Sequence, residues 1–254
     1  MNRRNFLRYA QLGTIASLGL GLKPQLAARA QAGSLNIQWL GHTCFLFSGS
    51  GRRVLVNPFE RRGCTADYRS PLVSTDFVFI SSQLSDEGAY QGLPGRPKLL
   101  SQAGTYDVEG FKVQGIKTLH DRKNGYQFGE NIAWKWQQGG LTIAHLGGIA
   151  SKIDIEQQIL IGSPDVMLVP VGGSAKAYTP AEAKEAVDAL EPKIVIPMHY
   201  KTQWSDTNNC DLLGVKSFLD LVNPTQVLQQ GQSLTLSANS LPTSGPIIYV
   251  MNYA

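Results

Sequence analysis

The sequence predicts a single domain of the α/β class, in which mixed β-sheets are covered by helices. Three observations support this prediction. The front of the chain carries short β-type runs separated by turns, the back alternates buried strands with helices, and 254 residues suit one large domain. Hydrophobic residues make up 43% of the chain and charged residues 17%, so there is enough apolar material for a substantial core.

The front half is expected to begin as a β-meander. The cluster Ser48-Gly49-Ser50-Gly51 predicts a turn between its second and third strands. Residues 76–81 (DFVFIS) are almost continuously apolar, which is typical of a strand buried on both faces. The expected strands cover residues 35–40, 43–47, 53–56, 76–81, 112–118, 132–136 and 141–145.

The back half is expected to alternate strands and helices. The clearest helix start has Thr179 as N-cap, Pro180 at the first helical position and Glu182 completing a capping box. Further helices are expected over residues 153–161 and 211–222, and strands over 165–171, 193–197, 233–236 and 247–251.

Residues 1–32 have the pattern of an export signal and are set apart from the domain at residues 33–254. Arg3-Arg4 precedes an apolar run over residues 9–22, and Ala30-Gln31-Ala32 has the form of a cleavage site. The arginine pair resembles a twin-arginine signal, which would make the twin-arginine export machinery a partner of the precursor. The expected location is therefore the periplasm or an equivalent extracytoplasmic compartment. An uncleaved anchor and an ordinary amphipathic N-terminus are the alternatives.

Removing this segment changes the charge of the protein. Residues 1–32 hold five basic residues and no acidic one, so the totals of 23 basic and 19 acidic residues become 18 and 19. The remaining sequence has no basic run, and a nucleic-acid partner is therefore not expected.

The chain has three cysteines, Cys44, Cys64 and Cys210. Their number is odd and no Cys-x-x-Cys spacing occurs, so neither a disulfide framework nor a zinc finger is indicated. One bridge could form after export, but the spacing does not select a pair. Three unpaired thiols are the expectation.

Polar residues follow three of the buried strands. Residues 82–87 come after the strand at 76–81, His145 ends the strand at 141–145, and His199 follows the strand at 193–197. Ligands in α/β proteins bind beyond the carboxyl ends of the strands, so Asp86, His145 and His199 are expected to converge in one cleft. His120, after residues 112–118, and His42, in the first turn, are further candidates for this cleft.

Several segments resemble, in consistent order, the metallo-β-lactamase superfamily of Zn-dependent hydrolases. They are Trp39-Leu40-Gly41-His42, Asn57-Pro58-Phe59, His145-Leu146-Gly147-Gly148, Val169-Pro170-Val171-Gly172-Gly173 and Ile196-Pro197-Met198-His199-Tyr200. The resemblance spans most of residues 35–251. It implies a four-layer αββα sandwich in which a metal-activated water attacks a substrate held between the sheet edges.

The same resemblance identifies metal ligands that this chain lacks. The central H-x-H-x-D-H motif of the superfamily corresponds to residues 82–87, which read SQLSDE. Ser82 and Leu84 replace two histidines, Glu87 replaces a third, and Gly148 replaces the aspartate that bridges two metal ions. Asn57 stands where the superfamily has an acid. The motif is therefore degenerate, and only Asp86, His145 and His199 keep the expected type.

This ligand count predicts no two-metal centre. One metal position keeps a single ligand and is expected to be empty, because zinc takes three or four ligands in proteins. Asp86, Glu87 and His199 could hold one zinc, manganese or iron ion. The prediction is an exported, hydrolase-like protein with at most one metal ion and an unidentified small-molecule ligand or substrate. The alternative is a non-catalytic binding or scaffolding protein, and the sequence leaves open whether the chain is an enzyme.

Each candidate residue also has a structural interpretation. His145 is expected to hydrogen-bond within the fold, and His42 to support the site or the fold rather than bind a metal. His120 and Asp121 either form an orienting pair or make a salt bridge in their loop. Asp86 could instead cap a helix after its loop.

Overall fold

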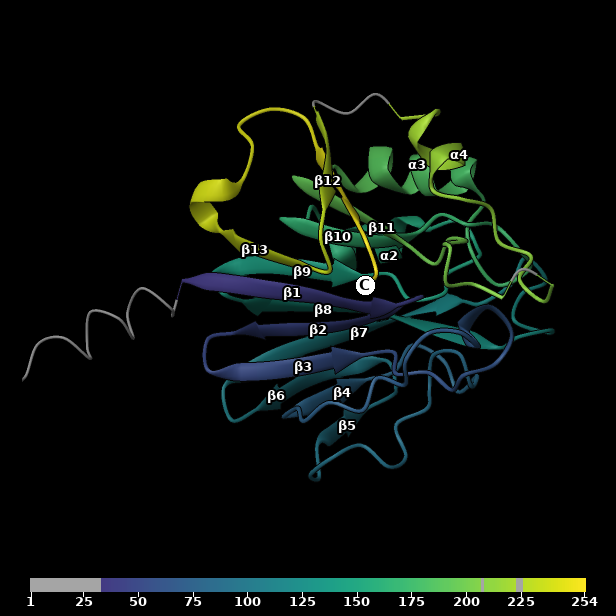
Figure 1. The fold of residues 1–254 in the computed structure, drawn as a ribbon. Helices are drawn as coiled ribbons and strands as arrows, with labels where there is room; N and C mark the ends of the chain where they lie inside the picture. The colour runs from purple at the N-terminus through teal and green to yellow at the C-terminus, as the bar shows by residue number, and fades with distance from the viewer. Residues whose placement is uncertain (1–32, 207, 223–225) are drawn as a thin grey trace, which may run out of the picture.

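The computed structural model describes residues 33–206, 208–222 and 226–254. The predicted export signal at residues 1–32 lies outside these residues. In the described part, a six-stranded and an eight-stranded sheet face each other (Figure 1). No helix of this part is long and apolar enough to cross a membrane.

The six-stranded sheet contains the predicted meander. In spatial order its strands are β13 (Ser233–Ser237), β1 (Ser34–Gly41), β2 (Cys44–Gly49), β3 (Arg52–Val56), β4 (Phe77–Phe79) and β5 (Lys98–Leu100). β13, β1, β2 and β3 pair antiparallel, and β4 and β5 continue the sheet in parallel. β5 was not predicted, because three residues are too few to show a strand period.

The eight-stranded sheet supplies the edge on which three of the six candidate site residues, His120, His145 and His199, lie. In spatial order its strands are β12 (Gln226–Gln230), β14 (Ile247–Met251), β11 (Ile194–Met198), β10 (Val166–Pro170), β9 (Leu141–His145), β8 (Glu130–Gln138), β7 (Phe111–Leu119) and β6 (Gly104–Val108). β9, β10 and β11 are parallel neighbours, so their carboxyl ends share one edge. Sequence reasoning missed β6 and β12, which are mostly polar and lie at the two ends of the sheet.

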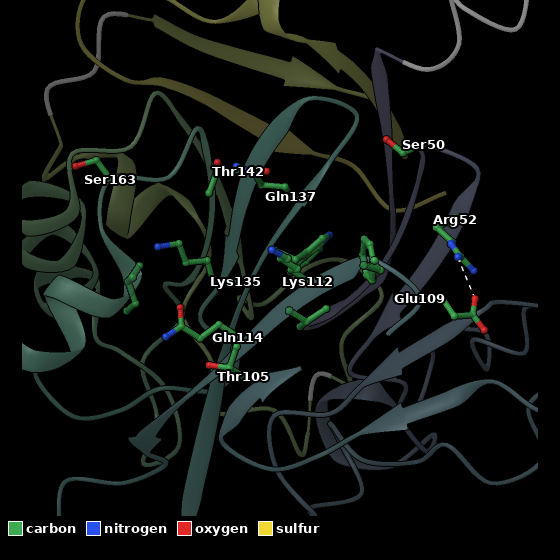
Figure 2. A pocket seen from close by; sticks show the side chains of 15 residues that line it. Ser50, Arg52, Thr105, Glu109, Lys112, Gln114, Lys135, Gln137, Thr142 and Ser163 are labelled. Atoms are coloured by element: carbon green, nitrogen blue, oxygen red, sulfur yellow. Dashed lines mark hydrogen bonds and ion pairs between the residues drawn. The ribbon is translucent and has the colours of Figure 1, made fainter. Parts of the chain in front are cut away.

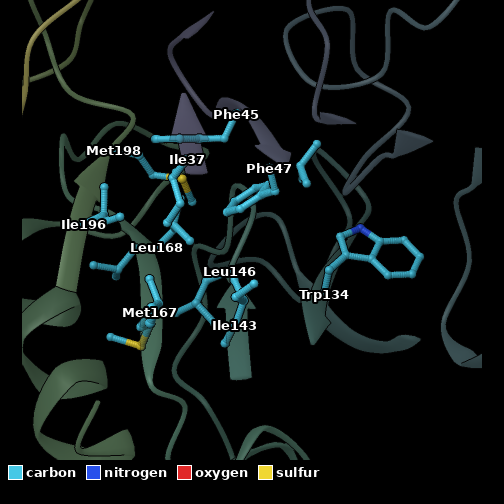
Figure 3. Close-up of a cluster of buried hydrophobic side chains, with 14 of the residues drawn as sticks. Ile37, Phe45, Phe47, Trp134, Ile143, Leu146, Met167, Leu168, Ile196 and Met198 are labelled. Carbon is cyan, nitrogen blue, oxygen red and sulfur yellow. The ribbon is translucent and has the colours of Figure 1, made fainter. Parts of the chain in front are cut away.

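The hydrophobic core lies between the two sheets (Figure 3). Phe47 of β2 meets Trp136 of β8 edge-to-face with 4.9 Å between ring centroids. Phe79 of β4 stacks on Trp134 of β8 at 5.1 Å. Each such pair contributes about 0.5–1.5 kcal/mol beyond the burial of its area. These core contacts fix the two sheets relative to each other, and the site lies at one edge of the resulting sandwich.

Two helices follow the prediction closely. α2 (Ile155–Ile161) begins after Asp154, whose side chain accepts a hydrogen bond from the Gln157 backbone N–H. α3 (Pro180–Leu190) has the predicted capping box between Thr179 and Glu182. A short 3₁₀ turn, η2 (Ala238–Ser240), follows β13.

The helix predicted over residues 211–222 is wrong in extent, because α4 covers only Lys216–Leu219. The residues before it pair with two other loops. The Leu213 N–H donates to the Gly172 carbonyl, and the Lys201 N–H donates to the Leu213 carbonyl. These tertiary hydrogen bonds satisfy backbone groups that a helix would have paired internally.

Helical cover is sparse beside the six-stranded sheet. Within the described residues, the stretch between β3 and β5 contains only the strand β4 and one 3₁₀ turn, η1 (Gly63–Thr65). Helix-breaking residues explain this for the segment after Asp86, which contains Gly88, Gly92, Pro94, Gly95 and Pro97. The α/β sandwich is confirmed, with fewer helices than a full four-layer arrangement.

The alternative role of Asp86 as a helix cap is wrong, because the next element after its loop is the strand β5 and no helix begins there.

A disulfide joins Cys64 to Cys210, so the expectation of three unpaired thiols is wrong. The two cysteines are 146 residues apart in the sequence, and only the fold brings their Cα atoms to 4.5 Å. The bridge connects the loop around η1 to the loop before α4. Cys44 remains a buried free thiol.

Candidate functional site

The four histidines of the chain gather near one edge of the sandwich. His42 lies in the turn between β1 and β2, His120 follows β7, His145 ends β9, and His199 follows β11. All four are buried. Histidine would otherwise favour partial exposure, so this burial sets the group apart from surface histidines.

A cleft of about 260 Å³ opens at this edge. Its polar lining includes His42, Asp86, Lys176 and His199. His145 is not among the lining residues. Of the three residues predicted to converge, the structure therefore places Asp86 and His199 in one cleft and turns His145 elsewhere.

His42 and His199 form the floor of the cleft in direct contact. Their ring centroids are 4.0 Å apart in an edge-to-face arrangement. Both residues have a left-handed backbone, with φ of 53° and 54°. The His42 carbonyl holds this geometry because it accepts hydrogen bonds from the Trp39 indole at 3.1 Å and the His199 N–H at 3.3 Å. Such strained conformations persist where the surrounding structure enforces them, often at functional sites.

Each of these two rings has a nitrogen without a hydrogen-bond partner among the described residues. The atoms are Nε2 of His42 and Nδ1 of His199. Burial lowers the pKa of His42 to about 4, although the nearby Asp86 carboxylate acts in the opposite direction. Burial likewise lowers the pKa of His199, and His42 and Lys176 lower it further. Both rings are therefore neutral at neutral pH.

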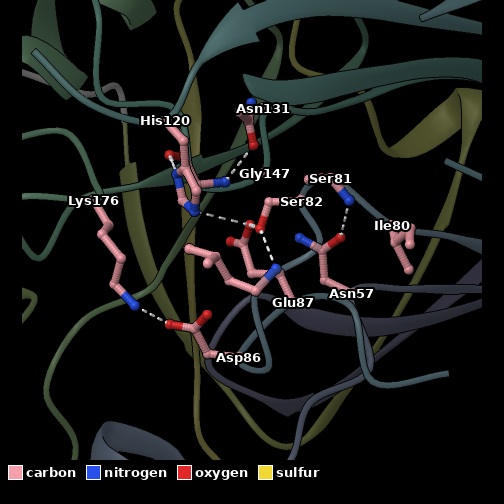
Figure 4. Close-up of polar contacts among 12 residues, drawn as sticks. Asn57, Ile80, Ser81, Ser82, Asp86, Glu87, His120, Asn131, Gly147 and Lys176 are labelled. Atoms are coloured by element: carbon pink, nitrogen blue, oxygen red, sulfur yellow. Dashed lines mark hydrogen bonds and ion pairs between the residues drawn. The ribbon is translucent and has the colours of Figure 1, made fainter. Parts of the chain in front are cut away.

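Asp86 is held by a lysine. Its carboxylate forms an ion pair with the Lys176 ammonium (Figure 4), and its Oδ2 is 4.0 Å from His42 Nε2. Burial alone would raise the pKa of Asp86, but His42 and Lys176 outweigh this effect and lower it. The ammonium also lies 5.9 Å from the centroid of the Phe128 ring. Sequence reasoning missed Lys176, because a lone lysine in a loop resembles any surface lysine.

Glu87 belongs to a separate, deeper cluster. It is fully buried, accepts a hydrogen bond from the Ser82 hydroxyl at 3.1 Å, and lies 3.5 Å from His120 Nε2 (Figure 4). Burial and the neighbouring Asp86 charge raise its pKa to about 8. Glu87 is therefore protonated at neutral pH and can donate to His120. It faces His120 and does not line the cleft with Asp86 and His199.

His120 completes this cluster from the other side. Its Nδ1 bonds the Gly148 carbonyl, which can only accept, so Nδ1 carries the hydrogen and Nε2 is free to accept from Glu87. A Cβ at Gly148 would lie 2.1 Å from His120 Cε1 and 2.7 Å from Glu87 Oε1. The His120 ring and Glu87 thus fill the space that an aspartate at position 148 would need.

His145 has the structural role expected of it. Its Nδ1 accepts from the Gly147 N–H at 3.2 Å, so Nε2 is the protonated nitrogen that donates to the Thr43 carbonyl at 3.0 Å. Burial lowers its pKa to about 3. Both ring nitrogens are used inside the fold, and neither faces the cleft.

Asp121 and Asn57 also serve the fold. Asp121 accepts hydrogen bonds from four backbone N–H groups of the loop that follows it, at 2.7–2.9 Å. Desolvation acts to raise its pKa, but these four donors lower it to about 2. Among the described residues, Asp121 neither hydrogen-bonds to His120 nor forms a salt bridge, so neither of its predicted roles is found. The Asn57 side chain accepts from the Ser81 N–H at 2.8 Å and joins the ends of β3 and β4 (Figure 4).

The larger cavity of the molecule lies elsewhere. It encloses about 910 Å³ and is lined by β6, β7 and β8 and the end of α2 (Figure 2). An ion pair between Arg52 and Glu109 lies at its side. It contains none of the predicted site residues and no histidine.

The ligand set of a two-metal centre does not fit these side chains. In the described part of the chain, no three His, Cys, Asp or Glu residues form a group that could hold a metal ion. Asp86 is paired with Lys176, and His145 is bonded to backbone groups. The predicted set of Asp86, Glu87 and His199 is not assembled, because Glu87 turns to His120.

Comparison with known proteins defines the class of this fold. The Beta-lactamase superfamily domain matches residues 36–199. The chain therefore belongs to the beta-lactamase superfamily and has the metallo-β-lactamase fold. A Thermotoga maritima crystal structure, described as a candidate Zn-dependent hydrolase of the metallo-beta-lactamase superfamily, is 30% identical with a TM-score of 0.67. The match covers 85% of this chain and 98% of that chain.

Two curated relatives point to the same group of proteins. A UPF0173 metal-dependent hydrolase of Thermococcus onnurineus is 26% identical over 77% of this chain and 99% of its own length. A relative of the same name from Methanoculleus marisnigri is 28% identical over 66% of this chain and 82% of its own length. The chain is thus similar to metal-dependent hydrolases, which makes a metal ion the cofactor to test for.

Proposed function

We propose that this chain is an exported member of the superfamily that binds a small polar molecule and has no catalytic metal centre. The observation that carries the proposal is the packing of His120 and Glu87 against Gly148. An added Cβ there would lie 2.1 Å from the His120 ring, so the position that would bridge two metal ions has no space for a carboxylate. A site adapted for two ions would keep this space open.

The remaining residues support the same function. Ser82 and Leu84 offer no nitrogen ligand, and His145 is occupied by the Thr43 carbonyl and the Gly147 N–H. The cleft nevertheless persists, with a volume of about 260 Å³ and charged and imidazole groups on its wall. Concave sites with a few converging polar groups are typical of small-molecule binding.

Metal-dependent hydrolysis with one ion is the competing function. The names of the curated relatives favour it, since they are metal-dependent hydrolases. It would require Glu87 to leave His120 and turn toward Asp86 and His199. It would also require Asp86 to give up its ion pair with the Lys176 ammonium.

Export is the second part of the proposal. Arg3-Arg4 and the apolar run after it support a twin-arginine address, with the export machinery as partner and an extracytoplasmic compartment as destination. The Cys64–Cys210 disulfide supports this location independently, because such bridges persist in oxidising compartments and are rare in the cytosol.

Elemental analysis of the purified exported protein tests the absence of a metal centre. The protein should contain no stoichiometric metal as isolated, and none after incubation with zinc, manganese or iron followed by dialysis. Two zinc ions per chain, or one ion lost in His199→Ala and Asp86→Ala, would contradict the proposal and support the hydrolase.

Native mass spectrometry tests the binding function. The wild-type protein, purified gently from its own compartment, should carry a non-covalent small-molecule adduct. Ser85→Trp, which places a large ring at the wall of the cleft, should lose the adduct. A matched substitution on the outer face, Ser163→Trp in the larger cavity, should keep it. An adduct that responds to Ser163→Trp instead would place the binding site elsewhere.

A further inference from the structure

The cleft contains an internal cation. Asp86 keeps the residue type of a metal ligand, but its carboxylate binds the Lys176 ammonium. Lys176 comes from the loop after β10, ninety residues along the chain. Its backbone N–H donates to the Ser174 hydroxyl at 3.2 Å, and its ammonium lies over the Phe128 ring. The loops that carry Asp86, Phe128 and Lys176 therefore meet at this positive charge.

Two buried imidazoles beside this ion pair point to an unmet coordination. His42 and His199 are each 2% exposed and line the same cleft. His42 Nε2 and His199 Nδ1 have no hydrogen-bond partner among the described residues. Buried polar atoms in native proteins are almost always paired, so two orphans in one cleft require an explanation. A nitrogen lone pair without a donor is the group that a metal ion uses.

The described side chains form no metal-holding group as they stand, but one pair of candidate ligand atoms lies near the separation that a single ion requires. Two ligands of a tetrahedral zinc ion at about 2.0–2.2 Å lie roughly 3.4 Å apart. Asp86 Oδ2 is 4.0 Å from His42 Nε2, and the two histidine rings are 4.0 Å apart between centroids. A small movement of the Asp86 side chain would bring it into range. Lys176 opposes this movement, because its ammonium binds the Asp86 carboxylate and its positive charge repels a metal ion.

We propose that the Lys176 ammonium stands in place of a metal ion beside Asp86, and that its removal opens a single-ion site formed by His42, Asp86 and His199. The proposal rests on the metal-free function proposed above and deepens it. It assigns Lys176 a positive role: the lysine keeps the cleft free of metal and supplies a cation, held by its ion pair with Asp86, that a bound ligand would meet.

Zinc binding to lysine variants tests this proposal. Lys176→Met removes the charge and keeps a similar length, and Lys176→Gln is a second, polar replacement. Lys184→Met is the matched control, since Lys184 also pairs with an aspartate, Asp188, but on the surface of α3. Each protein is titrated with Zn²⁺ alone by calorimetry, and its metal content is measured after dialysis. Circular dichroism and the thermal midpoint verify folding.

The expected result is one zinc ion per chain in Lys176→Met and Lys176→Gln, and none in the wild type or in Lys184→Met. Adding His199→Ala or His42→Ala to Lys176→Met should weaken zinc binding at least about tenfold, since each removes one of three ligands. Zinc should also raise the thermal midpoint of the Lys176 variants only.

Two results would overturn the proposal. One is that Lys176→Met and Lys176→Gln fold but retain no zinc, which would leave the metal-free function intact. The other is retention that survives loss of both His42 and His199, which would place the ion elsewhere. Zinc retained by the wild type would instead contradict the metal-free function and this proposal together, so the two failures are distinguishable.

Discussion

Gly148 and His120 determine at the residue scale what this site can hold. Superfamily resemblance places an aspartate where Gly148 stands, and the structure shows that the missing side chain has been replaced by a neighbour's ring. A change at one position therefore cannot restore the original chemistry. Ser82, Leu84 and Glu87 stand at three further positions where the superfamily resemblance places histidines, so several residues would have to change together.

We expect Gly148→Asp to destabilise the protein by about 2–3 kcal/mol or more, because overpacking a buried site forces its neighbours to move. His120→Ala removes the ring that an added Cβ would meet at 2.1 Å. The double variant should therefore be more stable than Gly148→Asp alone, and chemical denaturation of all four proteins measures the coupling. Additive effects of the two substitutions would show that the ring does not fill this space.

Glu87 should make stability depend on pH. Its pKa is raised from 4.5 to about 8 by burial and by Asp86, so the folded protein holds this proton more tightly than the unfolded chain. The resulting stabilisation is complete below pH 4.5 and is lost as the pH rises to about 8. Glu87→Gln stays neutral, so its stability relative to the wild type should improve between these limits by on the order of a few kcal/mol.

Urea denaturation of the wild type and Glu87→Gln at a series of pH values measures this difference. Glu185→Gln, an exposed glutamate paired with Lys152, is the control and should follow the wild type. A difference between Glu87→Gln and the wild type that stays constant with pH would contradict the assignment of a protonated Glu87.

Loops rather than regular elements define the cleft at the element scale. The strands β9, β10 and β11 set the edge, but Asp86, Lys176 and His199 all stand in the segments that follow strands. One wall includes Cys64 and residues next to Cys210, so the disulfide lies directly beside the cleft. The stretch expected to be helical over 211–214 instead pairs with the Lys201 and Gly172 backbone and borders the same cleft.

We expect the Cys64→Ser/Cys210→Ser double variant to lose about 2–5 kcal/mol of stability. The bridge closes a loop of 146 residues, and the chain-entropy model gives about 5 kcal/mol as the upper value for a loop of this length. Denaturation with and without a reducing agent measures the effect. Reductant should destabilise the wild type and leave the double variant unchanged, and equal sensitivity of both would argue against the bridge.

At the scale of the whole molecule, we propose that an export address at residues 1–32 precedes the α/β domain. The basic character of the full chain, with a pI of 8.9, arises from residues 1–32, because the remainder carries 18 basic and 19 acidic residues. The domain that would function after export is therefore almost neutral. Its partners are expected to be small molecules rather than polyanions.

Replacing Arg3 and Arg4 together by lysine should leave the precursor on the cytoplasmic side, because the twin-arginine machinery reads the arginine pair. Arg8→Lys keeps the pair and is the matched control. Fractionation and mass spectrometry of the N-terminus measure both location and processing, with the processed wild type beginning near residue 33. Unchanged amounts of a processed form beyond the membrane would remove the twin-arginine assignment.

The sequence by itself determined those helix ends and strands whose cause lies in residues close together along the chain. The capping box of α3 needs only Thr179 and Glu182, and the buried strands β9, β10 and β11 are continuous apolar runs. The order of the superfamily segments predicted the α/β sandwich, which is confirmed, while the loss of metal ligands stays a prediction. These features are local in the chain, so their physical causes are visible in its order.

Only the tertiary structure decided how the site is filled. Lys176 meets Asp86 across ninety residues, His120 packs against Gly148 across 28, and Cys64 reaches Cys210 across 146. A buried charge or ring takes whichever partner the fold brings near it, because an unpaired group in the interior costs several kcal/mol. Sequence spacing does not record that proximity, and for this reason the lysine, the disulfide and the inward turn of Glu87 became visible only in three dimensions.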